Sequence, residues 1–140
     1  MNKISKFIKY WLPVILWCSL IFYLSSQPNL RTSWGIWDSI LRKIAHALIF
    51  GMLAWLFWRG VMQKTRLPIE ENRDNKWKIK LILVIIFSVL YAFSDEFHQS
   101  FVPGRSGSII DVGIDSVGIL VFGWRMIKIK IKNRNENIKY

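Results

Sequence analysis

A dense polar segment, "SDEFHQSFVPGR" at residues 94–105, directly follows the apolar run "LILVIIFSVLYAF" at residues 81–93. It holds two carboxylates, a histidine, a glutamine and an arginine. Carboxylates and imidazoles can exchange protons, and arginine can form paired hydrogen bonds with a phosphate or a carboxylate. This composition indicates a site for an anionic ligand or for acid–base chemistry.

Two further stretches carry ionisable residues at helical spacing. Lys43 and His46 lie at i and i+3, and Asp111 and Asp115 lie at i and i+4, so each pair shares one face of a helix. At 1.5 Å per residue, Asp115 lies about 6 Å deeper than Asp111. An isolated carboxylate inside a membrane costs several kcal/mol. We therefore expect Asp115 to face other helices and to have partners there.

We predict that these stretches meet and form one polar cluster. The predicted ligand-binding residues all have charged or amide side chains: Lys43, His46, Asp95, Glu96, Gln99, Arg105, Asp111 and Asp115. The candidates for acid–base catalysis are His46, Asp95, Glu96 and His98. The alternative is a purely structural ion network, in which Lys43 and Arg105 neutralise the carboxylates and lock the helix ends together.

Metal binding and nucleophilic catalysis are less well supported by the spacing. Histidines and carboxylates are suitable metal ligands, but the sequence contains no HExxH and no other established zinc motif. No GxSxG motif surrounds the serines near residue 100, and "VPGRSGS" lacks the lysine of a phosphate-binding loop. We therefore predict neither a metal nor a cofactor.

The elements that must position these residues are long and apolar. The chain has 140 residues, of which 52% are hydrophobic, and its net charge is +11. We predict helices at residues 7–25, 40–62, 77–97 and 109–127, close to the roughly 20 residues that a spanning helix needs. The apolar runs are continuous rather than alternating, which argues against a transmembrane barrel. The predicted fold is one all-α membrane domain, residues 1–140, built as a compact bundle of four transmembrane helices.

The distribution of positive charge predicts the orientation of this bundle. Lysine and arginine gather at residues 3–9, 59–80 and 125–139, whereas Arg31 and Arg105 lie in the two poorer connections. Cytoplasmic segments are the richer ones in membrane proteins. We therefore predict that both termini, including a basic tail at 128–140, are cytoplasmic and that the polar cluster is extracytoplasmic. Because the charge flanks apolar segments, we expect membrane lipids rather than nucleic acid as partners.

Three stretches resemble the VanZ-like family of small bacterial membrane proteins: "YLSSQP", "KIAHALIFGMLAW" and "SDEFHQSFVPGRSGSIIDVGIDSVGILVFG". The positions that match the polar motif of the family are Lys43, His46, Asp95, Glu96, Gln99, Arg105 and Asp111. The chain differs from the family pattern at two positions. Phe50 stands where members often have tyrosine, and Asp115 stands where many have asparagine.

The resemblance implies a multi-pass protein of the bacterial cell membrane. Through the namesake of the family, it also implies a link to low-level resistance to the glycopeptide teicoplanin. We expect the polar cluster to bind a cell-envelope component, such as an anionic head group or a lipid-linked cell-wall precursor. Two alternatives remain open: a membrane enzyme that acts on a lipid-linked or phosphorylated substrate by acid–base chemistry, and a transporter that uses Asp115 as a proton or cation site.

Overall fold

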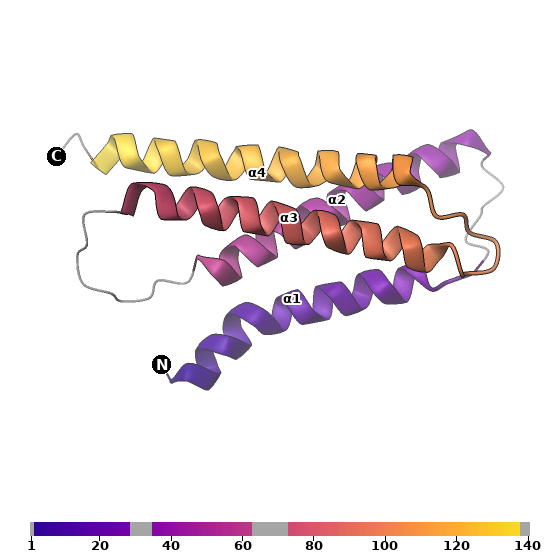
Figure 1. The fold of residues 1–140 in the computed structure, drawn as a ribbon, viewed down its shortest axis with the longest axis horizontal. Helices are drawn as coiled ribbons and strands as arrows, with labels where there is room; N and C mark the ends of the chain where they lie inside the picture. Colours follow the sequence, from indigo (N-terminus) through magenta and orange to yellow (C-terminus); the bar gives the residue numbers. More distant parts are fainter. Residues whose placement is uncertain (1, 29–34, 63–72, 138–140) are drawn as a thin grey trace.

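A computed structural model of the chain describes residues 2–28, 35–62 and 73–137. All regular structure in these ranges is helical, which confirms the all-α part of the predicted fold class. The helices are α1 (Lys3–Ser25), α2 (Ile36–Val61), α3 (Arg73–Gln99) and α4 (Ile109–Asn137) (Figure 1). Some of the basic residues on which the predicted orientation depends lie outside the described residues, namely Arg31, Lys64 and Arg66. So does the end of the chain from 138 to 140.

Each helix extends beyond the apolar run that predicted it. α2 begins at Ile36 rather than at 40, α3 begins at Arg73 rather than at 77, and α4 continues through the predicted basic tail to Asn137. The predicted boundaries followed hydrophobicity. A backbone helix needs only its own hydrogen bonds, so it continues into charged residues at either end. At its other end, α3 continues two residues past the predicted 97, to Gln99.

Three helices are long and apolar enough to cross a membrane, over Ile4–Ser25, Ile36–Val61 and Lys76–Gln99. Within the described part of the chain, α4 does not join this set, and it carries charges at both ends of its apolar stretch. The finding supports a membrane protein. That α4 also crosses the membrane stays a prediction.

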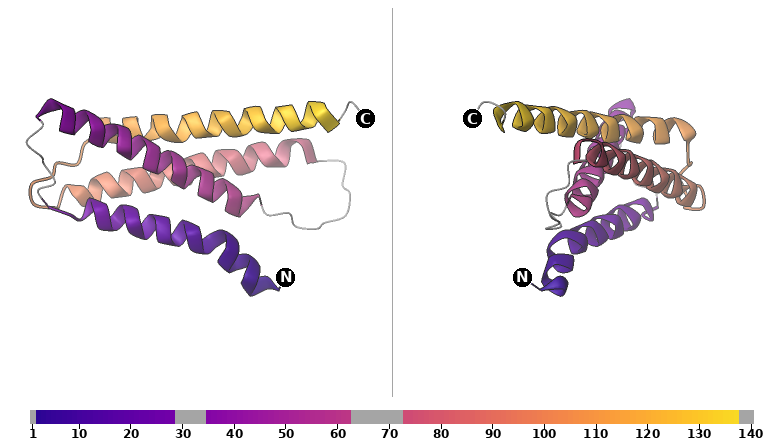
Figure 2. Two further views of the ribbon diagram at one scale, coloured as in Figure 1. Left: turned by 180° about the vertical axis from the view of Figure 1, so that it is seen from behind. Right: turned by 60° about the vertical axis from the view of Figure 1, so that its left-hand side comes forward.

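The helices run side by side so that their polar ends gather (Figures 1 and 2). α1 and α3 end where α2 and α4 begin, at the right of Figure 1, while the start of α1 and the end of α4 lie at the other end. The packed core lies between these ends and includes Phe50, Leu53, Val84 and Ile119, each at most 2% exposed. The core therefore holds the helices together next to the polar end, where α1 and α3 finish and α2 and α4 begin.

α2 and α4 cross at very short range. A Cβ atom added at Gly118 would lie 1.9 Å from the backbone oxygen of Ala47, so only glycine fits there. Ala47 follows His46, and Gly118 lies about one turn after Asp115. The crossing therefore brings His46 and Asp115 together. Gly113, on the same helix, makes no such approach, because a Cβ atom there would meet nothing within 4 Å.

Candidate functional site

A cavity of about 420 Å³ lies among α2, α3, α4 and the connection between α3 and α4. Most of the residues predicted as a ligand site line this cavity: Lys43, His46, Glu96, Gln99, Arg105, Asp111 and Asp115. Asp95 and His98 do not line it. The structure therefore gathers most of the predicted cluster, but divides it into a group on the cavity and a group on α1.

Ion pairs from α2 line one part of the cavity. Lys43 Nζ lies 2.5 Å from Asp111 Oδ1, which joins α2 to the first turn of α4. Arg42 and Asp38 form a second ion pair one turn apart on α2. The side chain of Lys43 is 44% exposed, so its ammonium group can also meet a ligand in the cavity. An ammonium group has three N–H donors, and Asp111 accepts from one of them.

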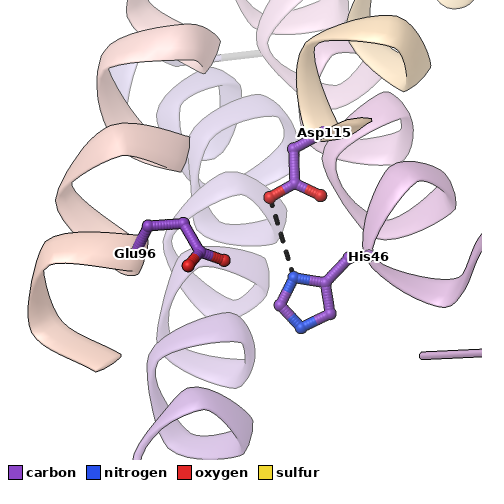
Figure 3. A group of neighbouring side chains, drawn as sticks. All are labelled: His46, Glu96 and Asp115. Atoms are coloured by element: carbon purple, nitrogen blue, oxygen red, sulfur yellow. Dashed lines mark ion pairs between the residues drawn. The ribbon is translucent and has the colours of Figure 1, made fainter. Parts of the chain in front are cut away.

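His46, Glu96 and Asp115 converge deeper in the site, each from a different helix (Figure 3). Asp115 is fully buried, and neither of its carboxylate oxygens has a hydrogen-bond partner among the described residues. His46 Nδ1 lies 3.7 Å from Asp115 Oδ2, which is too long for a hydrogen bond. One candidate ligand atom from each residue lies within 4.8 Å of the other two, so this is the group that could hold a metal.

Glu96 also organises the start of α4. Its Oε2 accepts a hydrogen bond from the backbone N–H of Ser108 at 3.0 Å, just before the helix begins. A carboxylate at a helix N-terminus is favoured by the helix dipole. A Cβ atom at Gly107 would lie 2.1 Å from the backbone oxygen of Glu96, so glycine is needed for this contact. The connection is therefore packed tightly on the end of α3.

Asp95 lies in a buried contact between α3 and α1. Its Oδ2 accepts hydrogen bonds from Ser25 Oγ and from Gln99 Nε2, both at 2.8 Å. The side chain is only 4% exposed. Buried carboxylates need such donors, because an unpaired one is costly. This arrangement gives Asp95 a structural role in the folded chain.

Arg105 is largely occupied by the end of α1. Its Nε donates to Gln27 O at 3.0 Å, its Nη2 to Leu24 O at 2.9 Å, and its Nη1 to Gln99 Oε1 at 3.1 Å. Carbonyl groups at a helix C-terminus lack N–H donors within the helix, and Arg105 supplies donors to them here. Burial lowers the pKa of the Arg105 guanidinium, which nevertheless remains charged. Three of its five N–H donors are therefore committed within the protein.

His98 faces α1 rather than the cavity. Its Nε2 lies 3.1 Å from Ser26 Oγ, and its ring stacks on Phe22 with centroids 4.5 Å apart. The other histidine among the predicted catalytic residues, His46, lines the cavity instead. The two histidines therefore do not form one catalytic pair.

Several polar residues on the cavity were not predicted. They are Asp38, Ser39, Arg42 and Ser106. Asp38 and Arg42 have opposite charges at i and i+4, a signal of a helix surface pair. That signal was missed because the predicted helix began only at residue 40. The cavity lining contains three basic side chains, Arg42, Lys43 and Arg105, and four acidic ones, Asp38, Glu96, Asp111 and Asp115, besides the imidazole of His46.

Comparison with known families gives a match over most of the chain. The family model described as VanZ/LLP1 matches residues 10–130. The matched range covers most of the chain and includes every residue predicted for the site. Comparisons with curated proteins and with solved structures gave no match.

Proposed function

The chain belongs to the VanZ/LLP1 family, and from that premise we propose that it is a multi-pass protein of the bacterial cell membrane that binds an anionic envelope component. In this proposal residues 1–140 form one domain with four spans, and both termini are cytoplasmic. The cavity then opens at the extracytoplasmic face. The counts of lysine and arginine in the connections support this orientation.

The proposal includes α4 as the fourth span. Acidic residues at one end of its apolar stretch and basic residues at the other make it too polar by composition, yet Asp115 is fully buried and Asp111 pairs with Lys43. Ionisable residues inside membranes face the bundle interior rather than lipid, as the buried Asp115 does here. α4 lies against α2 and α3 along much of its length, and Val117, Leu120 and Val121 expose apolar side chains outward. These features suit a helix in contact with lipid on one face.

A single observation carries the binding proposal: a cavity of about 420 Å³ near the polar end of the bundle, with a partly exposed Lys43 in its wall. Its ammonium group keeps two N–H donors for a phosphate or carboxylate, and Arg105 keeps two more. A suitable ligand is an anionic head group or a lipid-linked cell-wall precursor in the outer leaflet. Binding of such a component would alter susceptibility to teicoplanin, the phenotype linked to the namesake of the family.

The test uses the purified full chain in nanodiscs and a polyprenyl phosphate as the probe. We expect Lys43→Gln to weaken binding about tenfold, the effect of losing one charge-assisted hydrogen bond. The matched control is Lys128→Gln, since Lys128 lies over the Trp124 ring near the other end of α4. Equal affinity of both variants and the wild type would contradict the proposed site. In cells, Lys43→Gln but not Lys128→Gln should change the inhibitory concentration of teicoplanin.

A membrane enzyme is the second candidate, and the position of His46 favours it. This imidazole lies on the cavity beside the buried carboxylate of Asp115. A carboxylate can orient an imidazole for general acid–base catalysis of a lipid-linked or phosphorylated substrate, worth about 10²–10⁴ in rate. Release of inorganic phosphate from polyprenyl phosphate would support an enzyme. In that case His46→Gln should abolish release while binding persists.

A further inference from the structure

Asp115 is the buried acid that lacks a hydrogen-bond donor among the described residues, where the Ser88 hydroxyl and Arg59 Nε are also unpaired. Asp115 is 0% exposed, yet both of its carboxylate oxygens lack hydrogen-bond donors within the described residues. The other two buried acids both have donors: Asp95 accepts from Ser25 and Gln99, and Glu96 accepts from the N–H of Ser108. Buried polar groups in folded proteins are nearly always paired with protein, water or an ion. The carboxylate of Asp115 therefore points to a partner outside the chain.

Charge balance at this place calls for a cation. The carboxylate of Glu96 lies in the same group as Asp115, so two acids share a site with one imidazole. Lys43 pairs with Asp111, and Arg105 directs its hydrogen bonds to Leu24, Gln27 and Gln99, so among the described residues neither is bonded to Glu96 or Asp115. A protonated His46 would balance only one of the two carboxylates. A divalent ion would balance both and would also occupy the unpaired oxygens of Asp115.

We propose that His46, Glu96 and Asp115 bind a divalent transition-metal ion. The 3.7 Å between His46 Nδ1 and Asp115 Oδ2 is too long for a hydrogen bond. It is close to the separation of about 3.4 Å between two ligands on one tetrahedral zinc ion with bonds near 2.1 Å. The three ligand atoms lie within 4.8 Å of one another, so an ion at their centre would be at most about 2.8 Å from each. Side-chain movements of under about 1 Å would close these contacts.

The ligand types favour a transition metal over magnesium or calcium. Imidazole nitrogen suits zinc, iron and similar ions, whereas magnesium and calcium prefer sites built from oxygen alone. Glu96 has the outer support that metal ligands commonly have, because its Oε2 is held by the N–H of Ser108. The sequence predicts no metal, since the three residues come from three separate helices and form no motif. The metal site is proposed instead from their proximity.

Three protein ligands leave at least one coordination position open, as in catalytic zinc sites. His46, Glu96 and Asp115 all line the cavity, so an open position would face it. An anionic group held by Lys43 could then also bind the ion. Binding of an anionic group to the ion rests on the proposed function, whereas binding of the ion to the three side chains does not.

The experiment measures metal binding to the purified full chain in detergent. The protein is stripped with a chelator and titrated with Zn²⁺ or Mn²⁺, and bound metal is counted by mass spectrometry after gel filtration. We expect one ion per chain and a binding constant weakened more than tenfold in Asp115→Asn and in Glu96→Gln. The matched controls Asp95→Asn and His98→Gln alter an acid and a histidine outside the cavity, and they should bind like the wild type.

Thermal unfolding provides a second readout if one variant folds poorly. Zn²⁺ should raise the Tm of the wild type and of both controls, and should leave the Tm of Asp115→Asn and Glu96→Gln unchanged. Absence of a bound ion in the wild type, or equal binding by every variant, would overturn the metal site. Phosphate-lipid binding that depends on Lys43 in chelator-treated protein would show that the proposed function stands without the ion. Conversely, a wild-type protein that binds the metal ion but not the phosphate lipid would show that the metal site stands without the proposed function.

Discussion

Asp95 and Glu96 are adjacent in the sequence but serve different neighbours of α3. Asp95 accepts hydrogen bonds from Ser25 and Gln99, whereas Glu96 accepts from the backbone ahead of α4. Successive side chains on a helix point about 100° apart, so neighbouring acids reach different partners. Only Glu96 lines the cavity. A run of ionisable residues in sequence is therefore not one site in space.

This division predicts a stability effect for Asp95. Asp95→Ala would leave the hydroxyl of Ser25 and the amide of Gln99 without their buried acceptor, at a cost of about 1–3 kcal/mol. We expect a lower Tm in detergent, measured by circular dichroism, with binding of polyprenyl phosphate retained by the folded protein. Asp111→Ala is the comparison, since its side chain is 26% exposed and should cost less. An unchanged Tm for Asp95→Ala would contradict its structural role.

Arg105 acts as a clamp on α1 in the structure. A lysine has no planar fork, so Arg105→Lys cannot reproduce the simultaneous bonds to Leu24 O and Gln27 O. We expect faster amide hydrogen exchange at the C-terminal end of α1 in this variant. Arg125→Lys is the control, because Arg125 is exposed on α4, far along the chain from this contact. Unchanged exchange at residues 22–28 would show that the clamp contributes little.

At the scale of the helices, the crossing of α2 and α4 positions the cavity. Gly118→Ala should force these helices apart, because the added Cβ would lie 1.9 Å from the backbone of Ala47. We expect a loss of about 1–3 kcal/mol or more in stability, seen as a lower Tm in detergent. Gly113→Ala is the matched control on the same helix. Its Cβ would meet nothing within 4 Å, and alanine favours helices, so its Tm should stay level or rise.

The same pair of variants tests how the site is held. If the crossing aligns His46 with Asp115, Gly118→Ala should also weaken Zn²⁺ binding, whereas Gly113→Ala should not. A Gly118→Ala protein that melts like the wild type would mean that α2 and α4 can separate at no cost. That outcome would contradict the close packing of the bundle.

At the scale of the whole molecule, the number of spans can be tested by labelling. In a Cys18→Ser background, a cysteine at Ser106 should react with an impermeant maleimide added to intact cells. A cysteine at Ile131 should react only after the membrane is permeabilised, because we propose that α4 crosses it. Both positions are exposed in the folded chain. Labelling of both from the same side would show that α4 does not span the membrane.

Much of this molecule could be predicted because its signals are local. Apolar runs of helical length mark α1, α2 and α3, and the match over residues 10–130 agrees with the resemblance seen in three motifs. The spacing of Lys43 with His46, and of Asp111 with Asp115, correctly put each pair on one helix. The helix ends were less predictable. Hydrophobicity reports contact with lipid, whereas the helix itself continues into polar residues.

By itself, the sequence determined the helical membrane fold, the family, and the set of polar residues that gather at one end of the bundle. Only the tertiary structure decided how that set divides: Asp95, His98 and much of Arg105 serve contacts with α1, while His46, Glu96 and Asp115 meet on the cavity. The reason is physical. Composition and periodicity act within one helix, but the partner of a side chain depends on how helices rotate and cross, which here follows from the contact of Gly118 with Ala47.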